Sequence, residues 1–278
     1  MTQKSSYHID KTRKFYDHNA RKERDRLFIN QSHQVEYYIT SYYLNRYITS
    51  FKRGKILDAG GGPGRYTIYL AKKGYKLTLI DISSKELDLA KKEILKSKVG
   101  KNVDEIAQIN ILNLSSFPDD TFDSTIALGG VFSHLITKKE IQQSLSEFSR
   151  VTKKNGYIFI SVMSRFGEIG NRLVKNPQEV NTINKFLLDG IHRRRKTGEK
   201  TFTHFYTPLE LRKTIEKNGL EIKNIISTES ISYPLRQYVN NLPEKLFKEW
   251  LNIFIKLSEE QSLLGVSSHF MAIVKNTK

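Results

Sequence analysis

The sequence of 278 residues has no cysteine, one tryptophan and three methionines. Without cysteine there is no disulfide, no thiolate nucleophile and no cysteine-ligated zinc site, so an intracellular environment is expected. The chain also lacks an apolar run of the roughly 18 residues that a membrane-spanning helix needs. Its polar start, MTQKSSYHID, contains no apolar signal-peptide core. These absences predict a soluble cytoplasmic protein with no membrane partner.

Acidic residues are under-represented as well. The 46 Lys and Arg against 29 Asp and Glu give a formal net charge of +17, a balance typical of nucleic-acid-binding proteins. However, the lysines are spread over every segment, which a solvated, lysine-rich surface also explains. The densest basic runs are 21–26 and "HRRRK" at 192–196, and either would suit the entrance for an anionic substrate. RNA therefore remains an open partner.

Apolar periodicity and turn residues predict two N-terminal helices, 8–27 and 33–51, followed by alternating strands and helices. Three helix starts carry a capping box, in which a Ser or Thr is followed three residues later by a glutamate. These are Ser83 with Glu86, Thr137 with Glu140 and Thr207 with Glu210. The alternation predicts an α/β fold, a doubly wound and mostly parallel sheet with helices on both faces.

The same pattern divides the chain into four segments. We expect an N-terminal helical cap at 1–53, a core half at 54–164, a helical insertion at 165–206 and a C-terminal half of the sheet at 207–278, which holds a further helical insertion at about 231–267. Both insertions suit either a lid over a substrate or a dimer surface, so the oligomeric state, with a homodimer as one possibility, is left open.

A glycine-rich loop follows the first predicted strand in "KILDAGGGPGRYTIYL". In a parallel sheet, ligands bind beyond the carboxyl ends of the strands. Glycines there let the backbone approach a ligand closely, and the next helix offers it unpaired N–H groups. Asp81, at the end of the second strand, is placed to accept both hydroxyl protons of a ribose. The loop and this carboxylate together predict a nucleotide cofactor.

The spacing of the loop distinguishes two kinds of cofactor. The nicotinamide fingerprint G-x-G-x-x-G requires a small residue where this chain has Arg65. The pattern present is instead D-x-G-x-G-x-G from Asp58 to Gly64. An acidic residue at the start of the loop would repel a pyrophosphate, but it suits the ammonium group of an amino-acid tail.

These motifs resemble those of class I S-adenosylmethionine-dependent methyltransferases of the broad bacterial methyltransferase-domain family. The similarity runs from about 55 to 164 and returns at the ending "SSHFMAIVKN". It implies a Rossmann-like sheet of seven strands with the last one antiparallel, S-adenosyl-L-methionine as methyl donor and S-adenosyl-L-homocysteine as product. Asn110 stands where the family often has an aspartate, and its amide oxygen can still accept a bond from the adenine amino group.

The resemblance also implies a set of cofactor-binding residues. For the methionine part they are Asp58, Gly60, Gly61 and Gly62, and for the ribose Asp81. For the adenine they are Ile82, Leu87, Asn110 and Ile111. Leu128 and Gly129 end the fourth strand beside the cofactor, and Tyr16 and Arg24 belong to the helix expected to cover it.

Methyl transfer is an in-line displacement that depends chiefly on alignment of the acceptor, worth effective molarities of about 10⁵ to 10⁸ M. Several enzyme classes are disfavoured here. Attack on pyrimidine carbon 5 needs a cysteine, and "ALGGVFSHL" after the fourth strand holds neither an Asp/Asn-Pro-Pro-Tyr/Phe box nor a metal-binding carboxylate. We therefore expect metal-free methylation of an O or N atom of a small molecule. The alternatives are a metal-free RNA or ribosome methyltransferase and a cofactor-binding protein without turnover.

Four residues are candidates for orienting or deprotonating the acceptor, namely His134, Tyr16, His204 and Tyr206, and Arg165 is a fifth that could face it. Each also has an ordinary structural interpretation, as a packed or surface side chain. We further expect a closed, partly aromatic acceptor pocket. Its predicted lining is Phe132, Phe166, Phe202, Phe205, Tyr206 and Tyr233.

Overall fold

A seven-stranded sheet with strand order β3-β2-β1-β4-β5-β9-β8 forms the centre of the computed structural model. The structure describes residues 3–51, 53–196 and 199–278, and the side chains of 8–51, 53–192 and 202–278. The strands of this sheet are β1 (Lys55–Ala59), β2 (Lys76–Asp81), β3 (Val103–Gln108), β4 (Phe122–Ala127), β5 (Thr152–Met163), β8 (Glu221–Ser227) and β9 (His269–Lys275).

Strand directions match the prediction for the family. The pairs β1–β2, β1–β4, β2–β3 and β4–β5 are parallel, whereas β9 lies antiparallel between β5 and β8. The predicted fold class, a doubly wound sheet of seven strands with an antiparallel last strand, is confirmed. Because the strand order reverses between β1 and β4, the carboxyl ends of these strands open a crevice where a ligand can bind.

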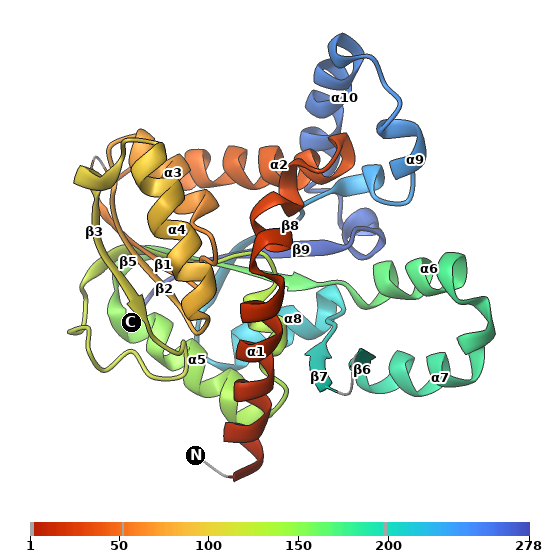
Figure 1. Cartoon of the computed structure of the whole chain (residues 1–278), viewed down its shortest axis with the longest axis horizontal. Helices are drawn as coiled ribbons and strands as arrows, with labels where there is room; N and C mark the ends of the chain where they lie inside the picture. Colours follow the sequence, from red (N-terminus) through yellow and green to blue (C-terminus); the bar gives the residue numbers. More distant parts are fainter. Residues whose placement is uncertain (1–2, 52, 197–198) are drawn as a thin grey trace.

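Helices cover both faces of the sheet (Figure 1). Their bounds are α1 (Gln3–Asp25), α2 (Gln31–Ile48), α3 (Arg65–Lys72), α4 (Ser84–Lys96), α5 (Lys138–Val151), α6 (Arg165–Lys175), α7 (Val180–Asp189), α8 (Pro208–Lys217), α9 (Arg236–Val239) and α10 (Glu244–Leu257). Six short 3₁₀ helices connect them among the described residues: η1 (Arg26–Phe28), η2 (Gly100–Asn102), η3 (Val131–His134), η4 (Pro177–Glu179), η5 (Ser230–Ser232) and η6 (Gln261–Val266).

The hydrophobic core lies in two layers, one on each face of the sheet, because successive strand residues point to opposite sides. On β5, Ile158 and Ile160 pack in the layer beneath α5 and α8, while Phe159 between them packs in the layer beneath α2, α3 and α4. All three are fully buried, and burial of each such side chain stabilises the fold by about 1.5–3 kcal/mol. The two filled layers hold the strand ends rigidly in place.

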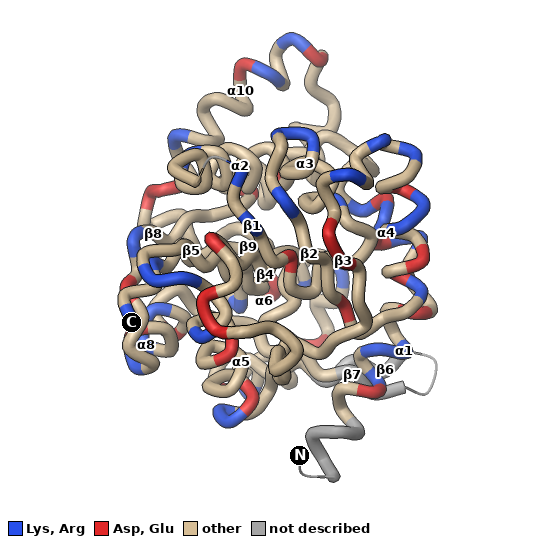
Figure 2. Tube along the Cα trace, turned by 90° about the vertical axis from the view of Figure 1, so that its left-hand side faces the viewer, with Lys and Arg blue, Asp and Glu red and all other residues tan. Residues whose placement is uncertain are grey.

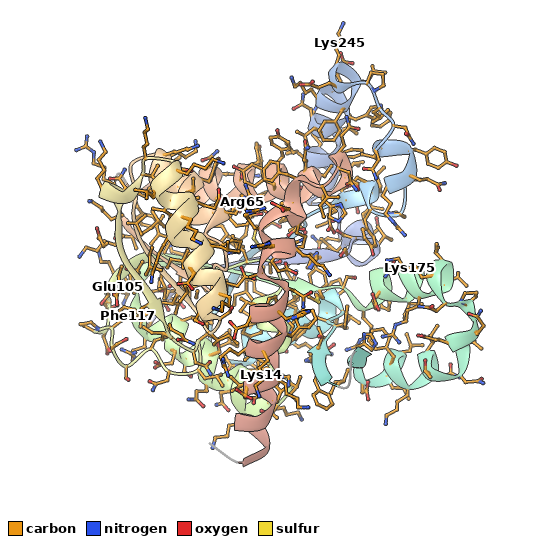
Figure 3. All side chains as sticks on the ribbon, in the orientation of Figure 1. Lys14, Arg65, Glu105, Phe117, Lys175 and Lys245 are labelled. Atoms are coloured by element: carbon orange, nitrogen blue, oxygen red, sulfur yellow. The ribbon has the colours of Figure 1, made fainter. Side chains whose placement is uncertain are left out.

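The two insertions project from the sheet (Figure 1). The first, predicted as helical, is only partly so: α6 and α7 are followed by a two-stranded hairpin of β6 (Ile191–Lys196) and β7 (Glu199–His204). The basic run at 192–196 is therefore strand β6, and from 193 on its side chains lie outside the described residues. The second insertion contains α9 and α10. Figure 3 labels Lys175 on α6 and Lys245 on α10, both far from the sheet.

Two further observations bear on the predicted partners. Figure 2 shows Lys and Arg distributed over α3, α4, α5, α8 and α10, with Asp and Glu between them. Among the residues whose placement is described, no helix has both the length and the apolarity to cross a membrane.

Candidate active site

A pocket lies at the carboxyl ends of β1, β2, β3 and β4 and encloses about 1110 Å³, its open mouth included. From the core it is lined by Asp58, Gly60, Gly61, Gly62, Pro63, Asp81, Ile82, Glu86, Ile109, Asn110, Ile111, Leu128, Gly129, Val131 and His134. Most of the predicted cofactor-binding residues are among these.

The glycine loop needs its glycines for space as well as for conformation. Gly60 has φ +78°, and a Cβ on it would lie 2.4 Å from the side chain of Val131. A Cβ on Gly61 would lie 2.5 Å from the Asp58 carboxyl group. The N–H groups of Gly60 and Gly61 both donate to the carbonyl of Ile80, at 2.7 and 3.2 Å. The backbone of Gly60 and Gly61 therefore lies directly over the end of β2, and these two residues place no side chain in the pocket.

Asp81 is held by backbone N–H groups. Gly62 N donates to its Oδ2 at 3.0 Å and Ser83 N to its Oδ1 at 2.8 Å. Burial raises the pKa of Asp81 to about 6, although these N–H bonds act in the opposite direction. Each carboxylate oxygen has a further lone pair, and the contact of Asp81 with a ribose stays a prediction.

Asp58 sits beneath the loop and is 1% exposed. Its Oδ2 accepts a hydrogen bond from Thr67 Oγ1 at 2.6 Å. Burial, with a smaller contribution from the Asp81 charge, raises the pKa of Asp58 to about 7. A cation bound in the pocket would favour the charged form of both carboxyl groups.

Glu86 is a pocket residue that the sequence did not predict. Ser83 Oγ accepts a bond from Glu86 N at 3.1 Å, as expected for an N-cap. The predicted reciprocal half of this capping box is wrong, because the Glu86 carboxyl group faces the pocket instead of the Ser83 backbone. Neither carboxyl oxygen has a hydrogen-bond partner in the described part of the chain. The boxes at Thr137 and Thr207 are both complete.

Helix α1 covers the pocket and adds Ile9, Thr12, Tyr16 and Glu23 to its lining. It runs beside α4 and touches β7 (Figure 1). Ser83 Oγ donates to Asp17 Oδ1 at 2.7 Å, which fixes the middle of the helix to the start of α4. The sequence predicted that the N-terminal helix lies over the cofactor site, and the geometry agrees.

Tyr16 and His134 form a hydrogen-bonded pair across the pocket, with 2.7 Å between the phenol oxygen and Nε2. Their rings meet edge to face, with centroids 5.4 Å apart. Burial lowers the pKa of His134 to about 4, so its imidazole is neutral at pH 7. Burial also raises the pKa of Tyr16, which keeps the phenol protonated. The pair combines an O–H donor with a neutral imidazole at one wall of the pocket.

Arg24, predicted to reach the cofactor, lies outside the pocket lining. Its guanidinium bonds to Asp25 at 2.8 Å and approaches Glu93 at 4.0 Å, on the outer side of α1. Arg26, two residues further on, lines the pocket instead. The 3₁₀ turn that begins at Arg26 redirects the chain here, a change of register that a continuous helix over 8–27 does not predict.

The residues predicted after β5 do not reach this pocket either. His204 Nε2 bonds to Glu210 Oε1 at 2.9 Å, and Tyr206 is fully buried with its ring stacked on that of His204. Arg165 is buried as well, where its Nε donates to the carbonyl of Phe205 at 3.0 Å and its Nη2 to Glu210. These residues join the first insertion to the start of α8.

The predicted aromatic acceptor pocket is also corrected. None of its six residues lines the pocket found here. Phe132 belongs to the core, Phe166 is 47% exposed, and Phe205 packs against Phe186 at a centroid distance of 5.4 Å. Two adenine-side residues differ in detail: Leu87 is buried outside the lining, and Asn110 Oδ1 already accepts a bond from Leu112 N at 3.0 Å.

Behind the pocket lies an ion-pair network of one half-buried and three buried side chains, which we define as Arg26, Glu36, Glu229 and His269. The Arg26 guanidinium bonds to both oxygens of Glu36, at 2.6 and 3.0 Å. His269 Nδ1 lies 3.3 Å from Glu229 Oε1 and 3.9 Å from Glu36 Oε2. Burial alone would raise the pKa of Glu36, but the charges of Arg26 and His269 outweigh it and lower this pKa to about 2.

Glu36, Glu229 and His269 also present metal-ligand atoms within 4.8 Å of one another. Both oxygens of Glu36 are already bonded to Arg26, and Glu229 Oε2 accepts bonds from Ser267 Oγ at 2.6 Å and from the His269 backbone at 2.9 Å. The two carboxylates are therefore compensated by Arg26 and His269, and we assign ion pairing to this cluster.

Comparison with known proteins agrees with this geometry. Residues 57–160 match a family model described as "Methyltransferase domain". A Bacillus subtilis protein named as the methyltransferase YqeM is 29% identical over 115 residues. That match covers 41% of this chain and 44% of the relative, so it spans less than half of either.

Two other similarities cover more of the chain. The S-adenosyl-L-methionine-dependent Diels-Alderase iccD of Talaromyces variabilis is 25% identical over 229 residues, 80% of this chain and 68% of the relative. The structure of the 1,6-didemethyltoxoflavin-N1-methyltransferase of Burkholderia thailandensis aligns with a TM-score of 0.60 and 14% identity, over 100% of this chain and 92% of that one. Identity this low carries the fold alone.

Proposed function

We propose that this chain transfers the methyl group of S-adenosylmethionine to an O or N atom of a small molecule. The chain carries a class I S-adenosylmethionine-dependent methyltransferase domain. The predicted domain and its cofactor are confirmed by the match over residues 57–160. The observation that carries the proposal is a single pocket lined both by the glycine loop with Asp81 and by the Tyr16–His134 pair.

The residues of the pocket fit the cofactor. The loop backbone lies where any Cβ on Gly60 or Gly61 would collide, which leaves a smooth surface for the methionine part. Asp81 keeps free lone pairs for the ribose, and Ile82 with Ile111 offers apolar walls to the adenine. Asp58 and Glu86 add carboxyl groups suited to positive charge. Arg26 also lines the pocket, with its guanidinium bonded to both oxygens of Glu36.

When bound, the cofactor would supply an electrophilic methyl group on a positively charged sulfur. The chain's own contribution is alignment and exclusion of water. We assign Tyr16 and His134 to hold the acceptor's O–H or N–H by hydrogen bonding. A His134 of pKa about 4 is a weak base, so positioning is its principal role, with the leaving proton passed to solvent.

The lining favours a small molecule over RNA. Four carboxyl groups face the pocket, those of Glu23, Asp58, Asp81 and Glu86. The two arginines of the lining are both engaged, Arg26 with Glu36 and Arg65 with the carbonyl of Arg24. With both arginines engaged, the lining offers a phosphate backbone no free guanidinium, and helix α1 covers the approach (Figures 1 and 3). The lysines and arginines that give the net charge of +17 lie mainly outside this lining.

A second candidate follows from one relative. The Talaromyces protein, matched over 80% of this chain, is named as a cofactor-dependent Diels-Alderase rather than a methyltransferase. The similarity of this chain to that relative supports a pocket in which the bound cofactor assists a rearrangement of the second molecule, while the cofactor keeps its methyl group. In that case, the second molecule would change structure without gaining mass.

The test is incubation of the purified chain with methyl-labelled cofactor and, separately, a pool of small metabolites or total RNA. We expect label in the low-mass fraction, about tenfold less with Tyr16→Phe and none with Asp81→Asn. Arg24→Gln, outside the pocket, is the matched control. Label in RNA alone would refute the small-molecule acceptor, whereas a product of unchanged mass together with intact cofactor would establish the second candidate.

A further inference from the structure

We propose that the Glu86 carboxyl group binds the positively charged part of the methyl donor, so that the pocket distinguishes the charged donor from its neutral product. The inference rests on the cofactor binding proposed above, and it assigns a ligand contact to a residue outside the glycine loop. Glu86 is 1% exposed and faces the pocket from the first turn of α4.

The Glu86 carboxyl group lies beside Gly62, the third glycine of the loop. A Cβ on Gly62 would lie 3.6 Å from Glu86 Oε2, with no closer neighbour. The N–H of the same Gly62 donates to Asp81 at 3.0 Å. The Glu86 carboxyl group is therefore beside the segment expected to hold the methionine part and next to the carboxylate expected to hold the ribose.

The local charge balance is acidic in a basic protein. Burial raises the pKa of Glu86, and the charges of Asp81, Glu23 and Asp17 raise it further. Glu23 is paired with Arg26 at 3.3 Å and Asp17 with Arg13 at 3.1 Å, whereas neither Asp81 nor Glu86 has a cationic partner among the described residues. The arginines of the lining, Arg26 and Arg65, are paired with other groups. S-adenosylmethionine has a sulfonium, an ammonium and a carboxylate, a net charge of +1. Loss of the methyl group leaves a neutral zwitterion, for which an extra carboxylate is of less value.

The local helix chemistry supports a ligand role over a structural one. A glutamate three residues after a serine N-cap ordinarily bonds back to the backbone of that serine. Glu86 forgoes this bond, and both of its oxygens are buried without a partner among the described residues. A buried unpaired carboxyl group destabilises a fold. A loss of folding stability of this kind, in a side chain that lines a pocket, is characteristic of a side chain that bonds to a ligand.

The experiment is titration calorimetry of the whole chain at pH 7.5 with three ligands: S-adenosylmethionine, S-adenosylhomocysteine and adenosine. The variants are Glu86→Gln and Glu86→Met, with Asp88→Asn as matched control, since Asp88 is an exposed acid on the same helix. We expect Glu86→Met to weaken binding of the charged donor about tenfold or more, the range of one bond to a charged group. Binding of the product should change less than threefold, and adenosine not at all.

A second measurement separates a ligand role from a structural one. Glu86→Met removes an unpaired buried acid, so the melting temperature of the ligand-free chain should rise by about 2–4 °C. Equal weakening of all three ligands, or a fall in melting temperature, would overturn the proposal. So would unchanged donor affinity in both variants. If the wild-type chain binds none of the three ligands, the proposed function itself fails, a result that the variants cannot mimic.

Discussion

Arg26 lies between two groups of charged side chains, the ion-pair network and the acids of the pocket. The two groups differ in whether each charge has a partner within the protein. In the ion-pair network, Arg26, Glu36, Glu229 and His269 compensate one another within the protein. In the pocket, Asp81 and Glu86 face a cavity, and Glu86 has no partner in the described structure. The network lowers the pKa of Glu36 to about 2, whereas the pocket raises that of Glu86 to about 9. Compensated charges stabilise a fold; uncompensated acids indicate a ligand that carries positive charge.

The largest effect should come from Glu36→Ala. This change removes the buried carboxylate shared by Arg26 and His269, which keep only Glu23 and Glu229 at 3.3 Å each. Breaking a buried ion pair costs about 3–5 kcal/mol. We expect the free energy of unfolding, measured by urea denaturation, to fall by that amount. Glu105→Ala, at an exposed glutamate on β3 (Figure 3), is the control and should change it by less than about 0.5 kcal/mol. A loss below about 1 kcal/mol for Glu36→Ala would refute the role of the network.

The next effect concerns the pocket. Asp81→Asn replaces a carboxylate that accepts from both Gly62 N and Ser83 N, and the new amide nitrogen can accept from neither. We expect cofactor affinity to fall about 100-fold in titration calorimetry, part of it through the changed loop. Asp104→Asn, on the exposed side of β3, should leave the affinity unchanged. An unaltered affinity in Asp81→Asn would contradict the placement of the ribose.

The two groups should also respond to pH in opposite directions. The folded chain keeps a proton on Glu86 up to about pH 9, whereas an unfolded chain loses it near 4.5. Stability from this group is therefore complete at low pH and is lost as pH rises to 9, by at most about 1.4 kcal/mol per pH unit. For Glu36 the lowered pKa has the reverse effect, with stability lost as pH falls from about 4.5 to 2.

Between pH 7 and 9 the folded chain loses the proton of Glu86, whereas Asp81 and Asp58 lose theirs at about 6 and 7. His269, whose pKa is raised by Glu36 and Glu229 against the effect of burial, also contributes stability that is lost as the pH rises, so the share of Glu86 is the difference between the wild-type chain and Glu86→Gln. Unfolding of the ligand-free chain in urea should show stability falling across this window. In Glu86→Gln the decline should be smaller. A slope that is the same in both proteins would show that Glu86 does not hold its proton in the folded chain.

The smallest effect is expected for Arg24→Gln. Its guanidinium pairs with Asp25 and approaches Glu93 at the outer side of α1, and half-exposed pairs of this kind contribute about 0–1 kcal/mol. Cofactor affinity should change less than twofold in the same calorimetric titration. A tenfold loss would restore Arg24 to the cofactor site and remove Arg26 from it.

The sequence predicted the fold well because its signals are local. Strand β2 ends at Asp81 and helix α5 begins directly after Thr137, as predicted, and the capping boxes at Thr137 and Thr207 formed as expected. The glycine loop and Asp81 were also predictable, since their roles depend on spacing along two adjacent strands. The regular geometry of the sheet places such motifs side by side at the carboxyl ends of the strands, where the pocket lies.

What the sequence could not predict depends on packing between distant segments. Glu86 looks like half of a capping box until the pocket shows what its carboxyl group faces. Arg26 takes the place expected for Arg24 because a 3₁₀ turn changes the register at the end of α1. His204, Tyr206 and Arg165 gather around the start of α8 because the Glu210 carboxylate accepts bonds from His204 and Arg165. Sequence spacing does not show that preference.

The central claim is that the acids of the pocket are held for a positively charged cofactor. The most direct test is the number of protons released when the wild-type chain binds S-adenosylmethionine at pH 8, measured by calorimetry in buffers of different ionisation enthalpy. A bound cation favours the ionised form of Glu86, so the account predicts net proton release with S-adenosylmethionine and markedly less with S-adenosylhomocysteine. Equal release with both ligands, or none with either, would contradict it.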